Sequence, residues 1–298
     1  MNKNLSTIMT IQSQLAYGYA GNNLAILAMQ LNGFDPIQIP TVFYSNHLEY
    51  DVVKGIKMNG YFLKQILCGI LKNNLLADES YIVSGFCNSI SVVEFIADVV
   101  KSYKKNSHVK YIYDPAFGDF RAGGLYNAKE VVSVALKELI PIADIITPNQ
   151  YELEYILGIK IVNPETLLHV IKNHTELSSK IIIITSVNFD NTPNDRIDVV
   201  LYSQYTLKIF YTPKINIDLV GCGDLFTALL VCQLKLNGSN IDKAIECVNK
   251  YIHQVMLFIY TNNMSGFTAQ VLLKYRSILY EEQQLEEVFD EPRNNNKH

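Results

Sequence analysis

The amino-acid sequence predicts a three-layer α/β fold in which a doubly wound, mostly parallel central sheet has helices on both faces. Apolar strand-like runs alternate with longer runs of helical period along most of the chain. Residues 181–184 are four consecutive isoleucines, a pattern typical of a strand that is covered on both faces. Residues 199–202 and 205–210 flank Ser203 and Gln204, which predicts an antiparallel hairpin at the edge of the sheet.

The other elements follow from local patterns of apolar residues. Short runs rich in β-branched and aromatic residues predict strands at residues 7–12, 36–39, 81–84, 109–113 and 144–146. Longer runs with apolar residues at helical spacing predict helices at residues 22–31, 61–71, 92–103, 128–139, 225–236 and 241–260. Because ligands of doubly wound sheets bind at the carboxyl ends of the strands, we expect a site in the loops that follow them.

Length and composition fit one globular domain. The chain has 298 residues, of which 49% are hydrophobic and 18% charged, and its mean hydropathy is +0.09. These values are typical of a well-packed core, and we expect a single domain over residues 1–290 and a disordered tail at 291–298. A net charge of −4 without a basic block argues against nucleic acid as a partner.

The cysteines and the apolar stretches bear on where the protein works. The five cysteines form no C-x-x-C pair, which argues against a zinc site and against a disulfide framework. Reduced thiols are typical of the cytoplasm. The N-terminus lacks the sustained apolar run of a signal peptide, and no stretch is long enough to cross a bilayer. We therefore expect a soluble, cytoplasmic protein without a membrane partner.

The most informative motif is Gly221-Cys222-Gly223-Asp224, which runs directly into the helix predicted at 225–236. Glycines let backbone N–H groups approach a ligand closely, and a helix N-terminus carries a partial positive charge. Together they form a cradle for an anion such as a phosphoryl group, with the Asp224 carboxylate beside it as a base. The motif alone also fits a glycine turn with an aspartate N-cap.

Two carboxylates follow the strand predicted at 109–113. Asp114 and Asp119 lie around a proline and a glycine, in a turn that suits phosphates and a hydrated magnesium ion. Ordinary turn chemistry explains the same residues. Gly123 and Gly124 then precede Tyr126 and suit either a lid over a ligand or a surface loop.

Two further polar groups follow later strands. Asn149 can cap a helix together with Glu152 three residues later, and this capping box explains the pattern as well as magnesium or phosphate binding does. Thr185 and Ser186 follow the isoleucine strand, where hydroxyl groups can bond a nucleotide phosphate.

A third group suits a flat aromatic ligand. Ser13 follows the first strand, and Thr41, Phe43 and His47 follow the second. Ligand pockets combine apolar walls with a few placed polar groups, as these residues do. The alternative is that Phe43 packs on the core and that His47 is an ordinary loop histidine.

In this order, the residues resemble the pyridoxal kinase family of the ribokinase-like superfamily. The resemblance covers residues 7–238 and is most specific in Ile11-Gln12-Ser13, Gly18-Tyr19-Ala20-Gly21-Asn22, Thr41-Val42-Phe43, Ser45-Asn46-His47, Asp114-Pro115, Gly118-Asp119 and Thr147-Pro148-Asn149 with Glu152. It implies that ATP phosphorylates the 5′-hydroxyl of pyridoxal, pyridoxine or pyridoxamine. It also implies Mg²⁺ bound with ATP and a homodimer, and it leaves open whether a monovalent cation such as K⁺ is needed.

The resemblance also implies a role for each candidate residue. Asp224 is the base for the alcohol, and the backbone amides of Gly221, Cys222 and Gly223 form the anion hole. The vitamin contacts are Ser13, Thr41, Phe43, His47 and Asp224. The residues on the ATP side are Asp114, Asp119, Tyr126, Asn149, Glu152, Thr185, Ser186, Gly221 and Gly223, with Asp119 and Glu152 facing the metal through water.

The chain departs from the family pattern in places. Cys222 stands where the family more often has Thr, Ala or Val, and Phe86 stands where it often has Tyr. Another kinase of the superfamily, for hydroxymethylpyrimidine or a sugar, is one alternative. Hydroxymethylpyrimidine kinases usually carry Gly-Gly-Ala-Gly after the first strand, whereas this chain has Tyr17-Gly18-Tyr19-Ala20-Gly21. A catalytically silent nucleotide- or B6-binding protein is the other.

Overall fold

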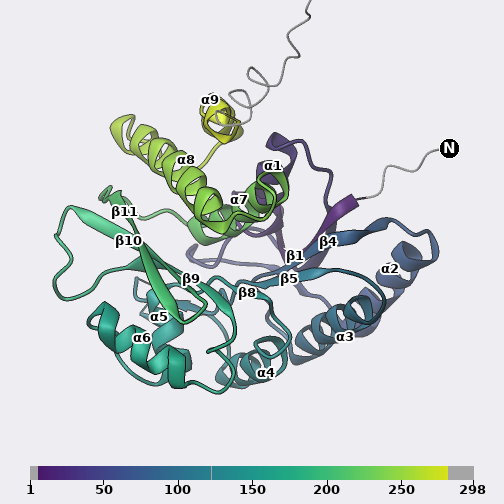
Figure 1. The fold of residues 1–298 in the computed structure, drawn as a ribbon. Coiled ribbons are helices and arrows are strands. Elements are labelled where there is room, and N and C mark those ends of the chain that lie inside the picture. Colours follow the sequence, from purple (N-terminus) through teal and green to yellow (C-terminus); the bar gives the residue numbers. More distant parts are fainter. Residues whose placement is uncertain (1–5, 122, 281–298) are drawn as a thin grey trace, which may run out of the picture.

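The computed structural model describes residues 6–121 and 123–280, and within these ranges a nine-stranded sheet forms the centre of the molecule (Figure 1). The strands lie in the order β11-β10-β9-β8-β5-β4-β1-β2-β3. Their bounds are β1 Ser6–Leu15, β2 Ile37–Tyr44, β3 Gly55–Lys57, β4 Leu76–Ser84, β5 Lys110–Tyr113, β8 Ile145–Ile146, β9 Ile181–Val187, β10 Arg196–Ser203 and β11 Thr206–Pro213. The neighbouring strands β2, β1, β4, β5, β8 and β9 pair in parallel, whereas β3, β10 and β11 pair antiparallel with their neighbours. A separate short ribbon joins β6 (Gly118–Asp119) to β7 (Gly124–Leu125).

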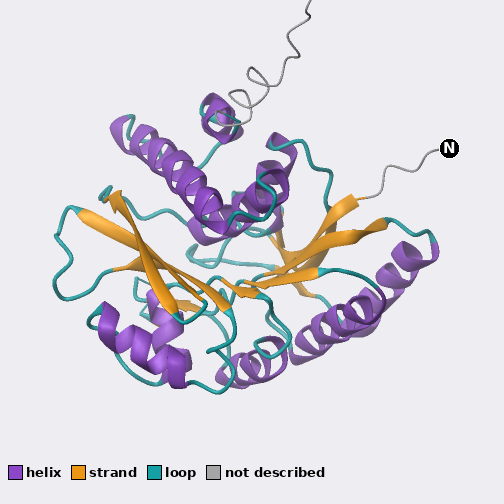
Figure 2. Cartoon of the chain, viewed as in Figure 1, coloured by secondary structure: helices purple, strands orange, loops and turns teal. Residues whose placement is uncertain are grey.

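Helices cover both faces of the sheet (Figure 2). One face carries α1 Asn22–Leu31, α7 Cys222–Leu236, α8 Ile241–Thr261, α9 Ala269–Lys274 and the 3₁₀ turn η1 Arg276–Leu279. The other face carries α2 Gly60–Lys72, α3 Ile90–Asn106, α4 Lys129–Leu139, α5 Gln150–Leu157 and α6 Pro164–Asn173. This arrangement confirms the predicted three-layer, doubly wound fold. None of the described helices combines the length and apolar character needed to cross a membrane.

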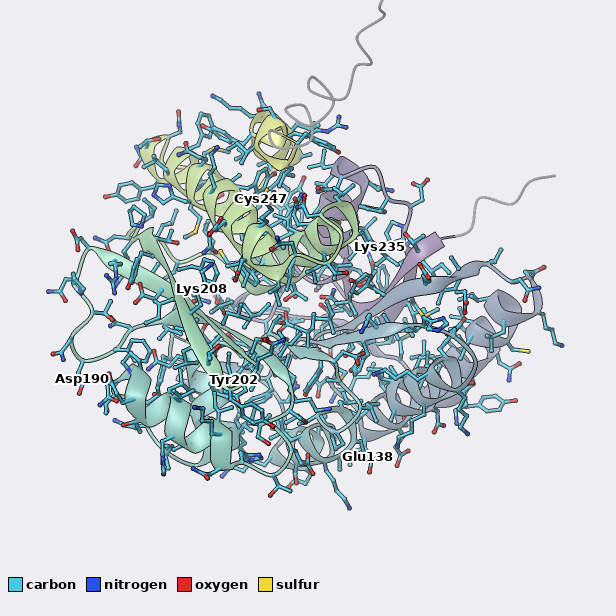
Figure 3. All side chains as sticks on the ribbon, in the orientation of Figure 1. Glu138, Asp190, Tyr202, Lys208, Lys235 and Cys247 are labelled. Carbon is cyan, nitrogen blue, oxygen red and sulfur yellow. The ribbon has the colours of Figure 1, made fainter. Side chains whose placement is uncertain are left out.

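The core consists of two clusters of buried side chains, one on each face of the sheet. The isoleucine strand contributes to both, because Ile182 and Ile184 belong to one cluster and Ile183 to the other, each with 0% exposure. Tyr202 of β10, labelled in Figure 3, is also fully buried, and its hydroxyl donates to the Ser178 carbonyl at 2.9 Å. The prediction that residues 181–184 are covered on both faces is therefore confirmed.

Some elements differ from the predicted ones. The edge hairpin turns at Gln204 and Tyr205, with φ of 48° and 62°, one residue later than predicted. A two-residue hairpin turn of this kind requires two residues with positive φ, and neither Gln nor Tyr is a residue type that favours this conformation. β3, α6 and α9 were not predicted, and β3 is only three exposed residues long. The predicted tail at 291–298 lies outside the described residues.

A buried asparagine fixes the place where the first loop of the site leaves the sheet. The register between β1 and β2 shifts between Gln12 and Gln14. Asn22, the first residue of α1, donates to the carbonyls of Gln12 and Ile39, both at 3.2 Å. It also accepts a hydrogen bond from the Thr10 hydroxyl at 3.0 Å. One side chain thus bridges the two strands at their irregularity and holds the start of α1 against them.

We predict that Asn22→Ala lowers the free energy of unfolding by about 2–4 kcal/mol, because it leaves buried carbonyl and hydroxyl groups unpaired. Urea unfolding followed by circular dichroism measures the change. Gln30→Ala, an exposed position on the same helix, is the control, and its effect should stay within about 0.5 kcal/mol. A loss in Asn22→Ala no larger than that of the control would contradict the bridging role.

Candidate active site

A cavity of about 180 Å³ opens at the carboxyl ends of the parallel strands. Residues that line it lie in the last part of β1, β2 and β9 or follow β1, β2, β4, β5 and β8, and the first turn of α7 lines it as well. Ser13 and Thr185 therefore lie within β1 and β9, because both strands continue past the predicted ends, and not in the loops after them. This is where a doubly wound sheet is expected to bind its ligands. The polar lining includes Ser13, His47, Glu49, Asp114, Asp119, Arg121, Tyr126, Thr147, Asn149, Glu152, Thr185 and Asp224.

The glycine loop forms one wall of this cavity. α7 begins at Cys222, directly after Gly221, whose φ of 92° lies in the left-handed region that favours glycine. A Cβ atom on Gly221 would lie 2.5 Å from the Tyr19 carbonyl oxygen, so this close approach requires a residue without a side chain. The first turn of α7, whose N–H groups have no partner within the helix and which carries the positive dipole end, therefore lies beside the cavity, as anion binding requires.

Asp224 is held in the first turn of α7 by a backbone group from a distant loop. Its Oδ2 accepts a hydrogen bond from the Gly21 N–H at 2.7 Å. Burial raises the pKa of Asp224 to about 6, against the opposing effect of that hydrogen bond. The carboxylate is therefore mostly ionised at pH 7 and is basic enough to accept a proton from a ligand.

Asp114 follows β5 and is buried against α7. Its Oδ2 accepts a hydrogen bond from the Thr227 hydroxyl at 3.0 Å, and Thr227 lies 2.9 Å from the Thr147 hydroxyl. Burial, with the charges of Glu152 and Asp224, raises the pKa of Asp114 well above its ordinary value. A cation in the cavity would favour the ionised form, since an opposite charge offsets the repulsion among these carboxyl groups.

Glu152 is both a helix cap and part of the cavity wall. Its Oε2 accepts from the Asn149 N–H at 3.0 Å, and its own N–H donates to the Asn149 side chain at 2.9 Å, so the predicted capping box is confirmed. Its Oε1 accepts from the Phe117 N–H at 2.8 Å. Burial raises the pKa of Glu152 to about 7, against these backbone hydrogen bonds. Glu152 also lines the cavity, so the same side chain caps α5 and forms part of the site.

Asp119 is paired with a cation that the sequence analysis missed. Arg121 donates to Asp119 Oδ2 from Nη2 at 2.8 Å and from Nε at 3.1 Å, and its backbone N–H donates to Oδ1 at 2.8 Å. Arg121 Nη1 also lies 3.7 Å from Asp218 Oδ1. The position of Arg121, two residues after a candidate site aspartate, was the feature of the sequence that could have indicated this pairing. The Thr147–Thr227 contact had no such signal, because it joins residues far apart in the chain.

The other predicted residues divide into those that line the cavity and those that do not. Ser13, His47, Tyr126 and Thr185 line it together with Asp224. Burial lowers the pKa of His47, against the opposing charge of Glu49, so its ring is neutral at pH 7. A neutral imidazole can both donate and accept a hydrogen bond.

Three predicted residues lie outside the cavity lining. Thr41 is buried, and its hydroxyl donates to the carbonyl of Phe86 at 2.6 Å. Phe43 is 44% exposed. Ser186 is exposed and has a φ of 55°. Phe86 itself does line the cavity. The ligand contacts assigned to Thr41, Phe43 and Ser186 stay predictions.

The carboxylates of the cavity suit a hydrated cation. Within the described ranges, no group of three or more His, Cys, Asp or Glu side chains is arranged to hold a metal ion directly. Asp119 and Glu152 already accept hydrogen bonds at both carboxylate oxygens. Mg²⁺ prefers oxygen ligands and keeps several of its waters, so contact through water fits both residues.

Comparison with known proteins gives consistent matches. The family model described as phosphomethylpyrimidine kinase matches residues 81–266. A pyridoxal kinase of Dictyostelium discoideum is 33% identical over 75% of this chain and 76% of that protein. The crystal structure of pyridoxal kinase from Entamoeba histolytica has a TM-score of 0.80 at 23% identity and covers 91% of this chain and 95% of that one. Pyridoxal kinase from Leishmania donovani in complex with ADP and pyridoxamine has a TM-score of 0.77 at 26% identity, with the same coverage.

The raised pKa of Asp224 predicts a pH-dependent effect on stability. Its folded pKa of about 6 lies above the value of about 3.9 for an unfolded chain, so the folded protein holds more protons between these values. Ionisation above about pH 6 therefore destabilises the fold. Asp224→Asn removes this charge and keeps an acceptor for the Gly21 N–H.

We expect Asp224→Asn to raise the free energy of unfolding by about 1 kcal/mol at pH 8, allowing for solvent screening, and to change it little at pH 4. Urea unfolding at the two pH values measures this difference. A variant that is less stable than the wild type at pH 8 would show that the buried charge does not oppose folding.

Proposed function

We propose that this chain, which belongs to the pyridoxal kinase family, transfers the terminal phosphoryl group of ATP to the 5′-hydroxyl of pyridoxal. Pyridoxine and pyridoxamine serve as further acceptors. The product from pyridoxal is pyridoxal 5′-phosphate, so the activity salvages vitamin B6. The observation that carries the proposal is the position of Asp224, in the first turn of α7 and bonded to the Gly21 N–H, on the wall of the cavity.

Asp224 is the base in this reaction. A bond forms between the 5′-oxygen and the terminal phosphorus of ATP while the bond from that phosphorus to the bridging oxygen breaks. ADP leaves with the electron pair of the broken bond, and Asp224 takes the proton of the hydroxyl group. A pKa of about 6 suits a base that works near neutral pH.

The amides of Gly221, Cys222 and Gly223 stabilise the group in transfer. Phosphoryl transfer passes through a loose transition state, so the enzyme contributes mainly positioning and charge stabilisation. Backbone N–H groups of the first turn of a helix are fixed before the reaction and need no reorganisation. Cys222 in place of a smaller residue is compatible with this role, because its backbone amide supplies the hydrogen bond.

The vitamin lies on the side of the cavity formed by the loops after β1 and β2. Ser13 and His47 line the cavity there, and we assign them the contacts with the ring of the vitamin. Thr41 shapes this side through its hydrogen bond to the Phe86 carbonyl, and we assign Phe43 a position near the vitamin. Phe86 offers an apolar contact where the family often has a tyrosine hydroxyl.

ATP lies on the side formed by the loops after β5 and β8 and by the end of β9. The proposed contacts of its phosphates and nucleoside are Asp114, Asp119, Tyr126, Asn149, Glu152, Thr185 and Ser186. Mg²⁺ accompanies ATP and supplies positive charge to its phosphates. Asp119 and Glu152 hold the hydrated ion through water, which fits the hydrogen bonds that both Glu152 oxygens already accept.

The proposal also covers the domain organisation, the oligomeric state and the location of the protein. Residues 1–290 form one kinase domain, which is supported by the single large sheet shared by both helix layers. Exposed apolar side chains in and around β3 and the start of α2 support a homodimer through this surface: Val52, Ile56, Tyr61 and Phe62. Free thiols at Cys68, Cys87, Cys222 and Cys232 support a cytoplasmic location.

A kinase for hydroxymethylpyrimidine is the second candidate, because the matching family model carries the description phosphomethylpyrimidine kinase. The segment Tyr17-Gly18-Tyr19-Ala20-Gly21 favours the vitamin B6 kinase, since it replaces the Gly-Gly-Ala-Gly stretch usual in the pyrimidine kinases. The two candidates share the phosphoryl-transfer residues and differ only in the acceptor.

We predict that purified protein with Mg²⁺ and ATP consumes pyridoxal far faster than hydroxymethylpyrimidine or ribose. Release of ADP measures turnover, with and without K⁺. Asp224→Asn should lower turnover by about 10²–10⁴-fold, the usual contribution of a general base, with little change in ATP affinity. Equal turnover of hydroxymethylpyrimidine would refute the assignment of the acceptor, and full activity of Asp224→Asn would refute the assignment of the base.

A further inference from the structure

Arg121 is the only lysine or arginine among the described residues that line the cavity. Five carboxyl groups line the same cavity, those of Glu49, Asp114, Asp119, Glu152 and Asp224. A bound nucleotide adds further negative charge to this wall. Phosphoryl transfer depends on positive charge at the group in transfer, and kinases and NTPases supply it with cations beyond the helix dipole.

The Arg121 side chain lies between the two parts of the wall that would meet the phosphates. On one side it donates to Asp119 at 2.8 Å. On the other side, its Nη1 lies 3.7 Å from Asp218, in the segment directly before the glycine loop. Its charge lowers the pKa of the Cys222 thiol, although burial has the larger effect and raises that pKa to about 12. The charge of the guanidinium is therefore felt at the residue where α7 begins.

The pairing between Arg121 and Asp119 competes with the role proposed for Asp119. Both oxygens of Asp119 accept hydrogen bonds from Arg121. A carboxylate that faces a hydrated cation and nucleotide phosphates needs some of those lone pairs. The Arg121 side chain is 40% exposed and can reorient without disturbing the core. Phosphate oxygens are strong alternative acceptors, because a guanidinium binds them through two parallel hydrogen bonds.

We propose that the Arg121 guanidinium leaves Asp119 when ATP binds and donates hydrogen bonds to the terminal phosphoryl group. This inference rests on the proposed kinase function and adds a catalytic residue to it. No covalent bond to Arg121 forms or breaks. The side chain stabilises negative charge on the phosphoryl oxygens while the proton goes to Asp224 and the electron pair leaves with ADP. Asp119 Oδ2 is then free to face the hydrated metal ion, while Oδ1 keeps its hydrogen bond from the Arg121 backbone N–H.

A purely structural role for Arg121 makes a different prediction. In that case the side chain would tie the β6–β7 loop to the segment that contains Asp218, and the loss of either partner would have the same effect. Asp218 is 82% exposed in its side chain and does not line the cavity. Asp218→Asn is therefore a matched control that removes the charge pair between Arg121 and Asp218 and keeps the guanidinium.

The test compares the affinity for two nucleotides in the variants Arg121→Met, Arg121→Lys and Asp218→Asn. Isothermal titration calorimetry measures binding of ADP and of the β,γ-imido analogue of ATP, and ADP release measures turnover. In Arg121→Met we expect kcat to fall about 100-fold, affinity for the analogue to fall about 10-fold, and affinity for ADP to stay near the wild-type value. Arg121→Lys should recover part of both losses, and Asp218→Asn should behave like the wild type.

Equal losses of affinity for ADP and for the imido analogue would overturn the proposal, because they would place Arg121 away from the terminal phosphate. If Asp218→Asn loses as much turnover and affinity for the analogue as Arg121→Met, the proposal is overturned and the role of Arg121 is structural. A wild-type chain that phosphorylates no B6 vitamer counts against the proposed acceptor alone, since the two-nucleotide comparison still decides the role of Arg121.

Discussion

The hydrogen bond from the Gly21 N–H to Asp224 joins two segments that lie 203 residues apart, and the site depends on it. It brings together the starts of α1 and α7, which pack on the same face of the sheet. The loop before α1 and the loop before α7 lie so close together that Gly221 has no room for a Cβ atom beside the Tyr19 carbonyl. A backbone donor therefore fixes the carboxylate beside the positive end of α7, where a phosphoryl group can be stabilised.

The same cavity gathers carboxyl groups that oppose folding. Burial raises the pKa values of Asp114, Glu152 and Asp224 above those of exposed carboxyl groups. Their mutual repulsion is offset only in part by backbone and hydroxyl donors such as Thr227. A site of this kind is stabilised by the cations it binds, and it persists without them because the apolar core on both faces of the sheet is extensive.

The sequence predicted the features that depend on local pattern. Alternating strand and helix periods are enough to place the sheet, and the glycine motif is enough to place the first turn of α7. What could not be predicted depends on contacts between distant segments. The Gly21 N–H to Asp224 contact and the Thr227–Asp114 hydrogen bond exist only once the chain has folded. The pairing of Arg121 with Asp119 is local, and the arginine two residues after the aspartate was a signal for it that the sequence analysis did not use.

The most direct test of a carboxylate base beside an anion hole is a crystal structure of this chain with Mg²⁺, the β,γ-imido analogue of ATP and pyridoxal. We predict the 5′-oxygen of pyridoxal within about 3 Å of an Asp224 oxygen, in line with the terminal phosphorus. That phosphate should accept hydrogen bonds from the amides of residues 221–223. A terminal phosphate bound away from these amides, or a 5′-oxygen remote from Asp224, would contradict the account.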